Sequence, residues 1–172
     1  MNMKNQIVAA VMAAAVVLSA ASCGTKTDYD VKLDKKEIVL PCTVDGLGEG
    51  YRLDASNTFQ IGGSNNGASL MKGDDVYGRV VTDETRIEDI DGKSNIHSLV
   101  IFGGEEGNDV KFSVNGVELG ATAEEVKKEL GVPDVSSDAS LKYRKGKTTV
   151  VFLLTEGVVT GISVADSGYE RK

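Results

Sequence analysis

The sequence predicts an α+β fold, in which a β-rich N-terminal lobe is followed by one short helix packed on a three-stranded antiparallel meander. Three observations support this prediction. Glycine is abundant, with 20 residues against 2 prolines, which indicates many turns between short strands. Residues 115–133 carry a full set of helix start and stop signals. Three apolar segments separated by Gly-containing turns follow that helix directly.

Residues 1–22 are expected to be a secretory signal peptide that is not part of the fold. Lys4 is the single charge before the apolar segment 7–18, and small residues follow that segment. At 1.5 Å per residue the apolar segment covers about 18 Å, well short of the ~30 Å hydrocarbon core of a bilayer. A membrane-spanning helix is therefore the weaker interpretation.

Ala21 and Ser22 stand directly before Cys23, and this pattern resembles the lipobox of bacterial lipoproteins, although Ala20 stands where the family usually has Leu. The resemblance implies that Cys23 carries a diacylglyceryl group on its thiol and becomes the first residue. Residues 23–30 would then be a tether, and its seven residues after Cys23 reach at most about 25 Å. The alternative is ordinary signal-peptidase cleavage, which would leave a soluble secreted protein in which Cys23 could pair with Cys42.

The chain is acidic, with a formal net charge of −7 at pH 7. An acidic domain is repelled by nucleic acids and by anionic lipid headgroups. The charge therefore favours a protein, a cation or a neutral glycan as the partner.

Residues 31–114 are expected to form the β-rich lobe. Clusters of Gly, Asn and Asp separate its strand-like segments, and one short helical turn is expected within residues 40–50. The expected strands cover residues 36–44, 51–54, 58–61, 76–81, 96–102 and 110–114.

Residues 115–172 are expected to form the helix and the meander. Thr122 and Glu125 have the spacing of a capping box, and Gly131 is a stop signal. Leu130 is expected to anchor the helix on the sheet, so that Leu130→Ala would cost about 2–5 kcal/mol. The apolar stripe of the helix, at positions i, i+3 and i+7, comprises Ala123, Val126 and Leu130.

The meander strands are expected at residues 141–144, 148–154 and 158–164. Val151 and Leu153 alternate with the buried positions of the middle strand, so they face the opposite side of the sheet. We expect the N-terminal lobe to cover that second face in part. The first face is expected to carry Val150, Phe152, Leu154, Val158, Ile162 and Val164.

The pattern Gly116-x-x-x-Gly120-x-Thr122-x-x-Glu125-Val126-x-x-x-Leu130-Gly131-x-Pro133, followed by a meander, resembles small lipoproteins related to the outer-membrane barrel-assembly lipoprotein. Similar helix-plus-sheet modules occur in β-lactamase-inhibitor-protein-like domains and in lipoproteins of Gram-positive bacteria. The family pattern has two helices before the sheet, whereas one helix is clear here. Such modules serve as scaffolds, adaptors and inhibitors, so the resemblance implies a type of module rather than one function.

The motifs and residues with possible chemistry predict no cofactor and no metal. Residues 62–69 have phosphate-loop glycine spacing, but Ala68 stands where that loop needs Lys, so a hairpin loop is expected. The acidic residues at 74–75 and 88–91 lack the ligand pattern of a calcium loop. His97 is the single His, and it is expected to be an outward-facing strand residue rather than a catalytic base. Cys42 is expected to be a small buried hydrophobe.

These observations favour an exported, lipid-anchored, non-catalytic binding or assembly module of the cell envelope, located outside the cytoplasm. The expected partner is an envelope protein that contacts the meander near Tyr143 and at the outward-facing Val151 and Leu153. The alternative is a secreted hydrolase that acts on envelope glycan with a pair of carboxylates. That alternative requires a deep cleft holding two acids with perturbed pKa values.

Cys23→Ala is expected to move the protein from the membrane fraction to the soluble fraction, because the attachment point of the lipid is removed. Fractionation of cells with immunodetection measures the distribution. Unchanged membrane partitioning of the variant, or an intact Cys23 thiol in the mature protein, would contradict lipidation.

Overall fold

The computed structural model describes residues 28–61, 65–103 and 110–168. The expected signal peptide 1–22, Cys23 and the tether up to residue 27 lie outside the described residues. Within the described segments, no helix has the length and apolar composition needed to cross a bilayer.

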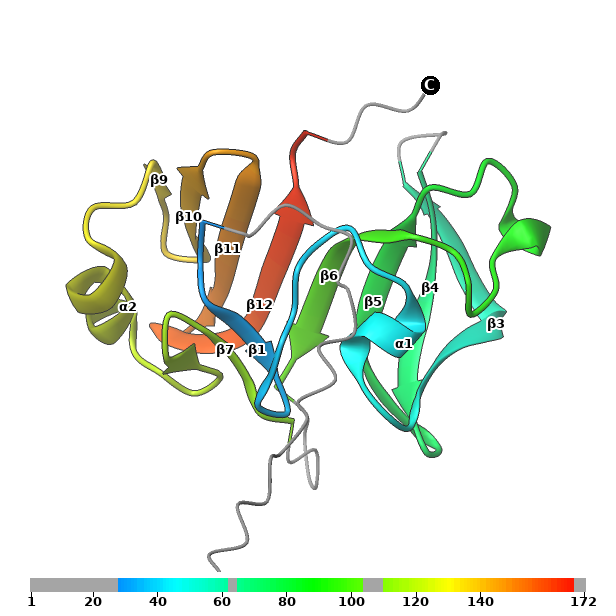
Figure 1. Ribbon diagram of the computed structural model, residues 1–172. Coiled ribbons are helices and arrows are strands. Elements are labelled where there is room, and N and C mark those ends of the chain that lie inside the picture. Colours follow the sequence, from blue (N-terminus) through cyan, green and yellow to red (C-terminus); the bar gives the residue numbers. More distant parts are fainter. Residues whose placement is uncertain (1–27, 62–64, 104–109, 169–172) are drawn as a thin grey trace, which may run out of the picture.

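The described residues form two antiparallel sheets, and the larger has eight strands in the order β3-β4-β5-β6-β12-β11-β10-β9 (Figure 1). Every neighbouring pair in it is antiparallel. Its strands are β3 (Tyr51–Ile61), β4 (Asn65–Lys72), β5 (Asp75–Thr82), β6 (Ile96–Phe102), β9 (Val135–Ser136), β10 (Ser140–Lys145), β11 (Thr148–Thr155) and β12 (Val158–Asp166).

The smaller sheet has four short strands in the order β2-β1-β7-β8. These are β1 (Val31–Leu33), β2 (Lys36–Glu37), β7 (Phe112–Val114) and β8 (Val117–Glu118). The described helices are α1 (Val44–Leu47), the 3-10 helix η1 (Ile87–Asp89) and α2 (Ala123–Leu130).

The fold is mostly β, so the predicted α+β class, with a helix packed on a three-stranded meander, is wrong. The meander β10-β11-β12 exists, but β12 pairs with β6 and the sheet continues through β5, β4 and β3. The sheet thus contains strands from both expected parts, 31–114 and 115–172. The physical reason is that an unpaired β12 would be an edge strand with exposed backbone groups. Pairing with β6 satisfies those groups and places Ile162 beside Ile101 in the core.

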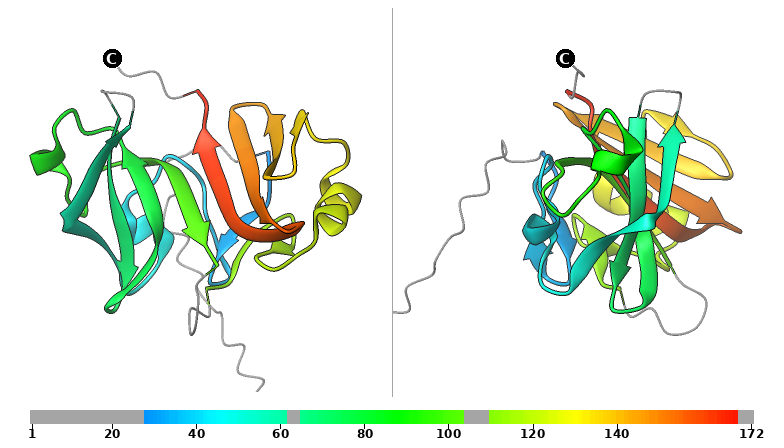
Figure 2. Two further views of the ribbon diagram at one scale, coloured as in Figure 1. Left: turned by 180° about the vertical axis from the view of Figure 1, so that it is seen from behind. Right: turned by 90° about the vertical axis from the view of Figure 1, so that its right-hand side faces the viewer.

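The core lies between the two sheets. The small sheet and α1 cover one face of the large sheet, as the front and side views show (Figures 1 and 2). Leu33 of β1 and Phe112 of β7 are fully buried in the same cluster as Phe152 and Ile162 of the large sheet. Burial of these apolar side chains is the main source of stability.

Several expected elements of the first part are corrected in extent. The segment 36–44 forms a strand only at Lys36–Glu37, whereas the expected helical turn in 40–50 is confirmed as α1. Residues 65–69, expected as part of the loop 62–69, instead belong to β4. The expected hairpin is confirmed, because β3 and β4 are antiparallel neighbours joined by residues 62–64.

The helix signals of the sequence are confirmed at α2. The Thr122 backbone N–H donates to Glu125 Oε2 at 2.8 Å, and the Glu125 N–H donates to Thr122 Oγ1 at 3.3 Å, which completes the capping box. Val126 is fully buried, whereas Leu130 packs against the core only in part. The main anchor of the helix is therefore Val126 rather than the expected Leu130.

A β-bulge in β12 changes which residues face the core. Leu153 pairs with Gly161, but Leu154 pairs with Val159, so Thr160 is the extra residue. Val159 is consequently buried, whereas Val158, expected in the core, is 38% exposed. The expected inward positions Val150, Phe152, Leu154, Ile162 and Val164 are confirmed.

Val126→Ala is expected to destabilise the protein by about 2 kcal/mol, because it removes fully buried methyl groups and leaves a cavity. Leu130→Ala is expected to cost about half as much, since the Leu130 side chain already contacts solvent. Urea unfolding of both variants measures the two free energies. A larger loss for Leu130→Ala than for Val126→Ala would contradict this assignment of the anchor.

Candidate functional site

The face of the large sheet that points away from the small sheet is covered by no described element (Figure 2, left). The expected partial cover by the N-terminal lobe on this side is therefore wrong. The first part of the chain extends the large sheet sideways through β3–β6, and its small sheet covers the opposite face.

The strand register places the residues of this uncovered side in three rows that run across the strands from β5 or β6 to β10. We call these residues the open face. The first row is Phe102, Gly161, Leu153 and Ser140; the second is Arg79, Val100, Ser163, Val151 and Lys142; the third is Val81, Ser98, Ala165, Thr149 and Arg144.

The centre of the open face is apolar and is organised around Gly161. A Cβ atom at Gly161 would lie 3.1 Å from Leu153 Cδ1 and 3.3 Å from Phe102 Cδ1. The two side chains thus lean over the glycine from neighbouring strands and fill the space that a larger residue would need. Phe102 remains 39% exposed.

Two of the residues predicted to bind a partner lie on the open face, and the third does not. Val151 and Leu153 alternate with the core positions of β11 and are half-buried. Tyr143 points to the other side of the sheet and is 4% exposed. Its hydroxyl donates to the Gly131 carbonyl at 3.2 Å, and its ring packs edge-on against Phe152 with centroids 6.1 Å apart.

The role of Tyr143 is therefore to pack the core and to hold the end of α2, so a partner docked on the open face cannot contact its side chain. Sequence reasoning also missed Phe102, Val100 and Arg79. The alternation within 96–102 marks Val100 and Phe102 as one face. However, only the pairing of β6 with β12 brings them beside Val151 and Leu153.

Cys42 and His97 are both held in structural roles. Burial raises the pKa of the Cys42 thiol to about 11, with a partial offset from Lys36, so the thiol is not activated as a nucleophile at neutral pH. His97 is 8% exposed, so its expected outward position is wrong. Its Nε2 lies 3.0 Å from the Thr82 carbonyl oxygen, and alternation along β6 places it on the same side as the buried Leu99 and Ile101.

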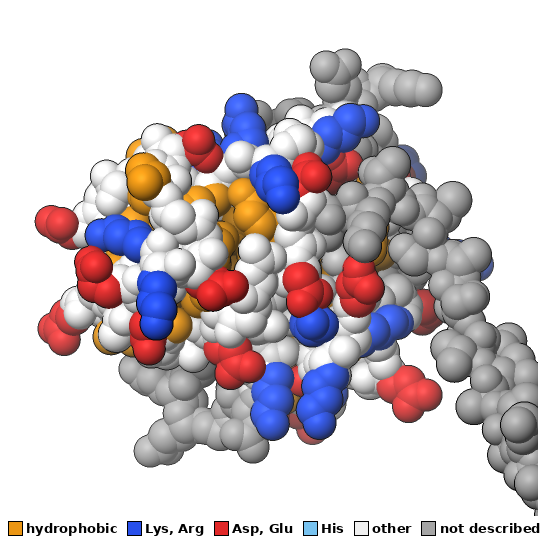
Figure 3. Space-filling view, turned by 60° about the vertical axis from the view of Figure 1, so that its left-hand side comes forward, with side chains coloured by type: hydrophobic (Ala, Val, Ile, Leu, Met, Phe, Trp, Pro, Cys, Tyr) orange, Lys and Arg blue, Asp and Glu red, His pale blue; other side chains and the backbone are white. Residues whose placement is uncertain are grey.

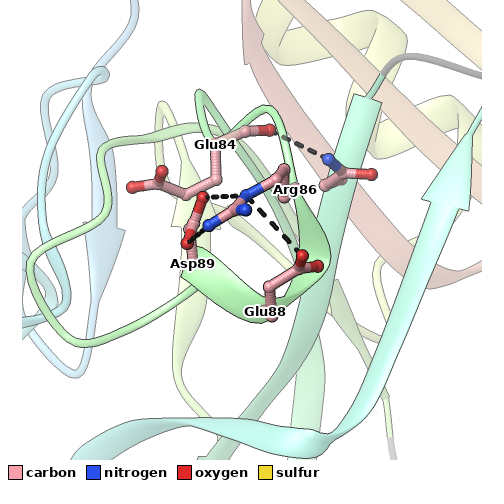
Figure 4. A network of polar contacts seen from close by, with 5 residues as sticks. Glu84, Arg86, Glu88 and Asp89 are labelled. Carbon is pink, nitrogen blue, oxygen red and sulfur yellow. Dashed lines mark hydrogen bonds and ion pairs between the residues drawn. The ribbon is translucent and has the colours of Figure 1, made fainter.

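The acidic segment 88–91 lies at η1, where Arg86 neutralises part of its charge (Figure 4). Arg86 donates to Asp89 from Nε at 2.8 Å and from Nη2 at 2.7 Å, and Nε lies 3.6 Å from Glu88 Oε1. The hydrogen bonds from Arg86 lower the pKa of Asp89. Within the described ranges, no group of three or more His, Cys, Asp or Glu side chains is arranged to hold a metal ion.

One partly buried polar cluster links the small sheet to the edge of the large one. Asp34 pairs with the Lys72 ammonium and accepts a hydrogen bond of 2.8 Å from the Tyr51 hydroxyl. Lys72 Nζ also lies 4.9 Å from the centroid of the Tyr51 ring. Burial alone would raise the pKa of Asp34, but the hydrogen bonds from Lys72 and Tyr51 outweigh it and lower the pKa.

The directions in which the carboxyl pKa values are shifted can be compared with what the hydrolase alternative requires. A glycosidase needs a carboxylic acid whose pKa is raised, so that it can donate a proton near neutral pH. The pKa values of Asp34, Asp54, Asp89 and Glu125 are all lowered by hydrogen bonds. These four groups therefore suit structural roles and not proton donation.

The α2 end of the molecule presents a second, smaller apolar feature (Figure 3). Hydrophobic side chains lie there among charged ones, and Val132 and Val135 are 93% and 54% exposed. An open groove of about 600 Å³ runs between residues 115–121 and α2, and Glu125, Lys128 and Glu129 line its helix side. Its acidic, solvated lining is unlike the mostly apolar lining of small-molecule sites.

Comparisons of the chain with protein-family models, with curated proteins and with solved structures found no match.

Asp34→Asn is expected to lower the free energy of unfolding at pH 7 by about 1–2 kcal/mol, because a charged pair and its hydrogen bonds are lost. The folded-state pKa of Asp34 is lowered, so its contribution is present above the ordinary Asp pKa and is lost as pH falls through the folded pKa. The difference between wild type and variant should shrink below about pH 3.

Denaturant unfolding at several pH values measures this difference, with Asp138→Asn in an exposed turn as the control. A difference between wild type and Asp34→Asn that is independent of pH would contradict a stabilising role for the Asp34 carboxylate.

Proposed function

We propose that this protein is an exported, lipid-anchored, non-catalytic module of the cell envelope that binds another protein through the open face. The observation that carries this proposal is the apolar centre formed by Phe102 and Leu153 over Gly161 on a side of the sheet that no described element covers. Contiguous apolar surface of this kind marks interaction sites in soluble proteins.

The shape of the face supports a macromolecular partner. Small molecules bind in concave sites that enclose most of their surface. The open face is instead a broad sheet surface spanning β5, β6, β12, β11 and β10. A protein surface can contact all five strands at once, and a mixture of apolar and polar side chains is typical of interfaces that form and dissociate.

The chemistry of the described residues supports a non-catalytic role. Nucleophilic catalysis needs an activated nucleophile next to a base. The Cys42 thiol has a pKa of about 11 and lies in an apolar setting, while the single His is buried against a backbone carbonyl. The sequence resemblance at Cys23 adds the anchor, which would hold the domain within tether length of a membrane.

A photo-crosslinking residue placed at Ser163 or Ser140 on the open face is expected to capture one specific envelope protein in intact cells. The same residue at the exposed Glu88 or Lys93, near η1, is expected to capture it at least about tenfold less, because η1 contacts β3, which is not one of the strands of the open face. Mass spectrometry of the crosslinked species measures both outcomes.

The Cys23→Ala variant is the matched control for anchorage and should give fewer crosslinks, since release from the membrane lowers the local concentration. Equal capture at Glu88 and at Ser163 would contradict binding through the open face. Turnover of envelope glycan by the purified domain, abolished by neutralising one acidic pair, would overturn the non-catalytic proposal.

A further inference from the structure

We infer that the partner of the open face is a protein whose contact surface carries acidic side chains around an apolar centre. This inference rests on the proposed function and adds the chemistry of the partner. The observation behind it is a difference in charge: the chain has a formal net charge of −7, yet the charged members of the open face are all cations, namely Arg79, Lys142 and Arg144.

Carboxylates flank the three cations but are not members of the open face. Asp134 Oδ2 accepts a hydrogen bond of 2.6 Å from the Arg144 backbone N–H. The row of Arg79 continues through Ser69 to Asp54. None of the other members of the open face is acidic, and none of the three cations forms an ion pair among the described residues. Arg79 has an orienting contact, because its guanidinium carbon lies 5.5 Å from the centroid of the Phe59 ring. Stacking on an aromatic ring leaves the guanidinium donors available to a carboxylate.

The cations stand at the two ends of the apolar centre. Arg79 and Lys142 close the same row, separated by Val100, Ser163 and Val151, and four strand spacings place their Cα atoms about 19 Å apart. Arg144 lies two residues along β10 from Lys142, about 7 Å away on the same side. An apolar centre with a charged rim at both ends is the usual arrangement of a protein interface.

An anionic membrane surface fits these charges less well. Each cation close to such a surface contributes about 1 kcal/mol, so three supply about 3 kcal/mol before repulsion of the acidic remainder of the domain. The half-buried side chains of a sheet also cannot insert into a bilayer as the apolar side of an amphipathic helix does. A partner with carboxylates matched to the two ends avoids both problems.

Charge reversal of the rim tests this inference in the crosslinking assay with the photo-reactive residue at Ser163. The Lys142→Glu/Arg144→Glu variant should lower the yield of the crosslinked protein about tenfold, because rim charges govern association and repel like charges. The control Lys93→Glu/Lys128→Glu makes the same change in net charge at exposed sites away from the open face and should leave the yield within about twofold.

Further measurements test whether a loss of crosslinking comes from misfolding of the variants or from loss of membrane binding, rather than from loss of partner binding. Thermal unfolding of both purified double variants should match that of wild type, and Lys142→Gln/Arg144→Gln should give an intermediate crosslinking yield. Acid-to-Lys substitutions in the partner, next to its crosslinked peptide, should restore the yield with the charge-reversed domain. Sedimentation of the purified domain with vesicles of phosphatidylglycerol in phosphatidylcholine should show no binding that depends on Lys142 and Arg144.

The outcomes distinguish this inference from the proposed function. Capture of a specific protein at Ser163 with unchanged yield after charge reversal would overturn the inference and leave the proposed function standing. No capture at Ser163 in any variant would overturn both. Vesicle binding that is lost on charge reversal would show that the face recognises lipid, which also overturns an acidic protein partner.

Discussion

Antiparallel pairing between β6 and β12 is the constraint on which the rest of the structure depends. It joins strands that stand about 60 residues apart and makes one eight-stranded sheet from two parts of the chain. Its register places Ile101 beside Ile162 and Leu99 beside Val164 in the core. Because side chains alternate along a strand, the same register brings Phe102 to Gly161 on the opposite side. The core and the candidate binding surface therefore follow from one pairing.

The shortage of covering elements explains why one side of the sheet stays open. Four strands of two or three residues, two short helices and η1 are the only described elements outside the large sheet. They suffice to bury one face, where fully buried apolar residues gather. An antiparallel sheet tolerates solvent on its second face when that face carries both polar and apolar side chains. The open face meets this condition, because the apolar Val151 lies between the polar Ser163 and Lys142 of the neighbouring strands.

The carboxylates whose pKa values are lowered belong to clusters that stabilise the fold. They are therefore unsuited to proton donation near neutral pH. Asp34, Lys72 and Tyr51 tie the small sheet to the edge of the large one, and Arg86 with Asp89 stabilises the turn at η1. Glu125 closes the start of α2. Each carboxylate is held in its charged form by a hydrogen-bond donor, which suits folding stability. The cations of the open face differ from these clusters, because none of their side chains forms an ion pair among the described residues.

Local sequence determined α2 with its capping box, the meander strands and α1, because each depends on residues close together in the chain. Alternation also placed Val151 and Leu153 opposite the core. Tertiary structure decided the rest. Local patterns do not encode which strand pairs with β12, so the fold class was mispredicted and Phe102 and Arg79 were missed. Because of the bulge at Thr160, Val159 is buried in the core, where Val158 was expected. Tyr143 turned inward because alternation along β10 places it beside Val150, whereas the sequence alone offered no register for that strand.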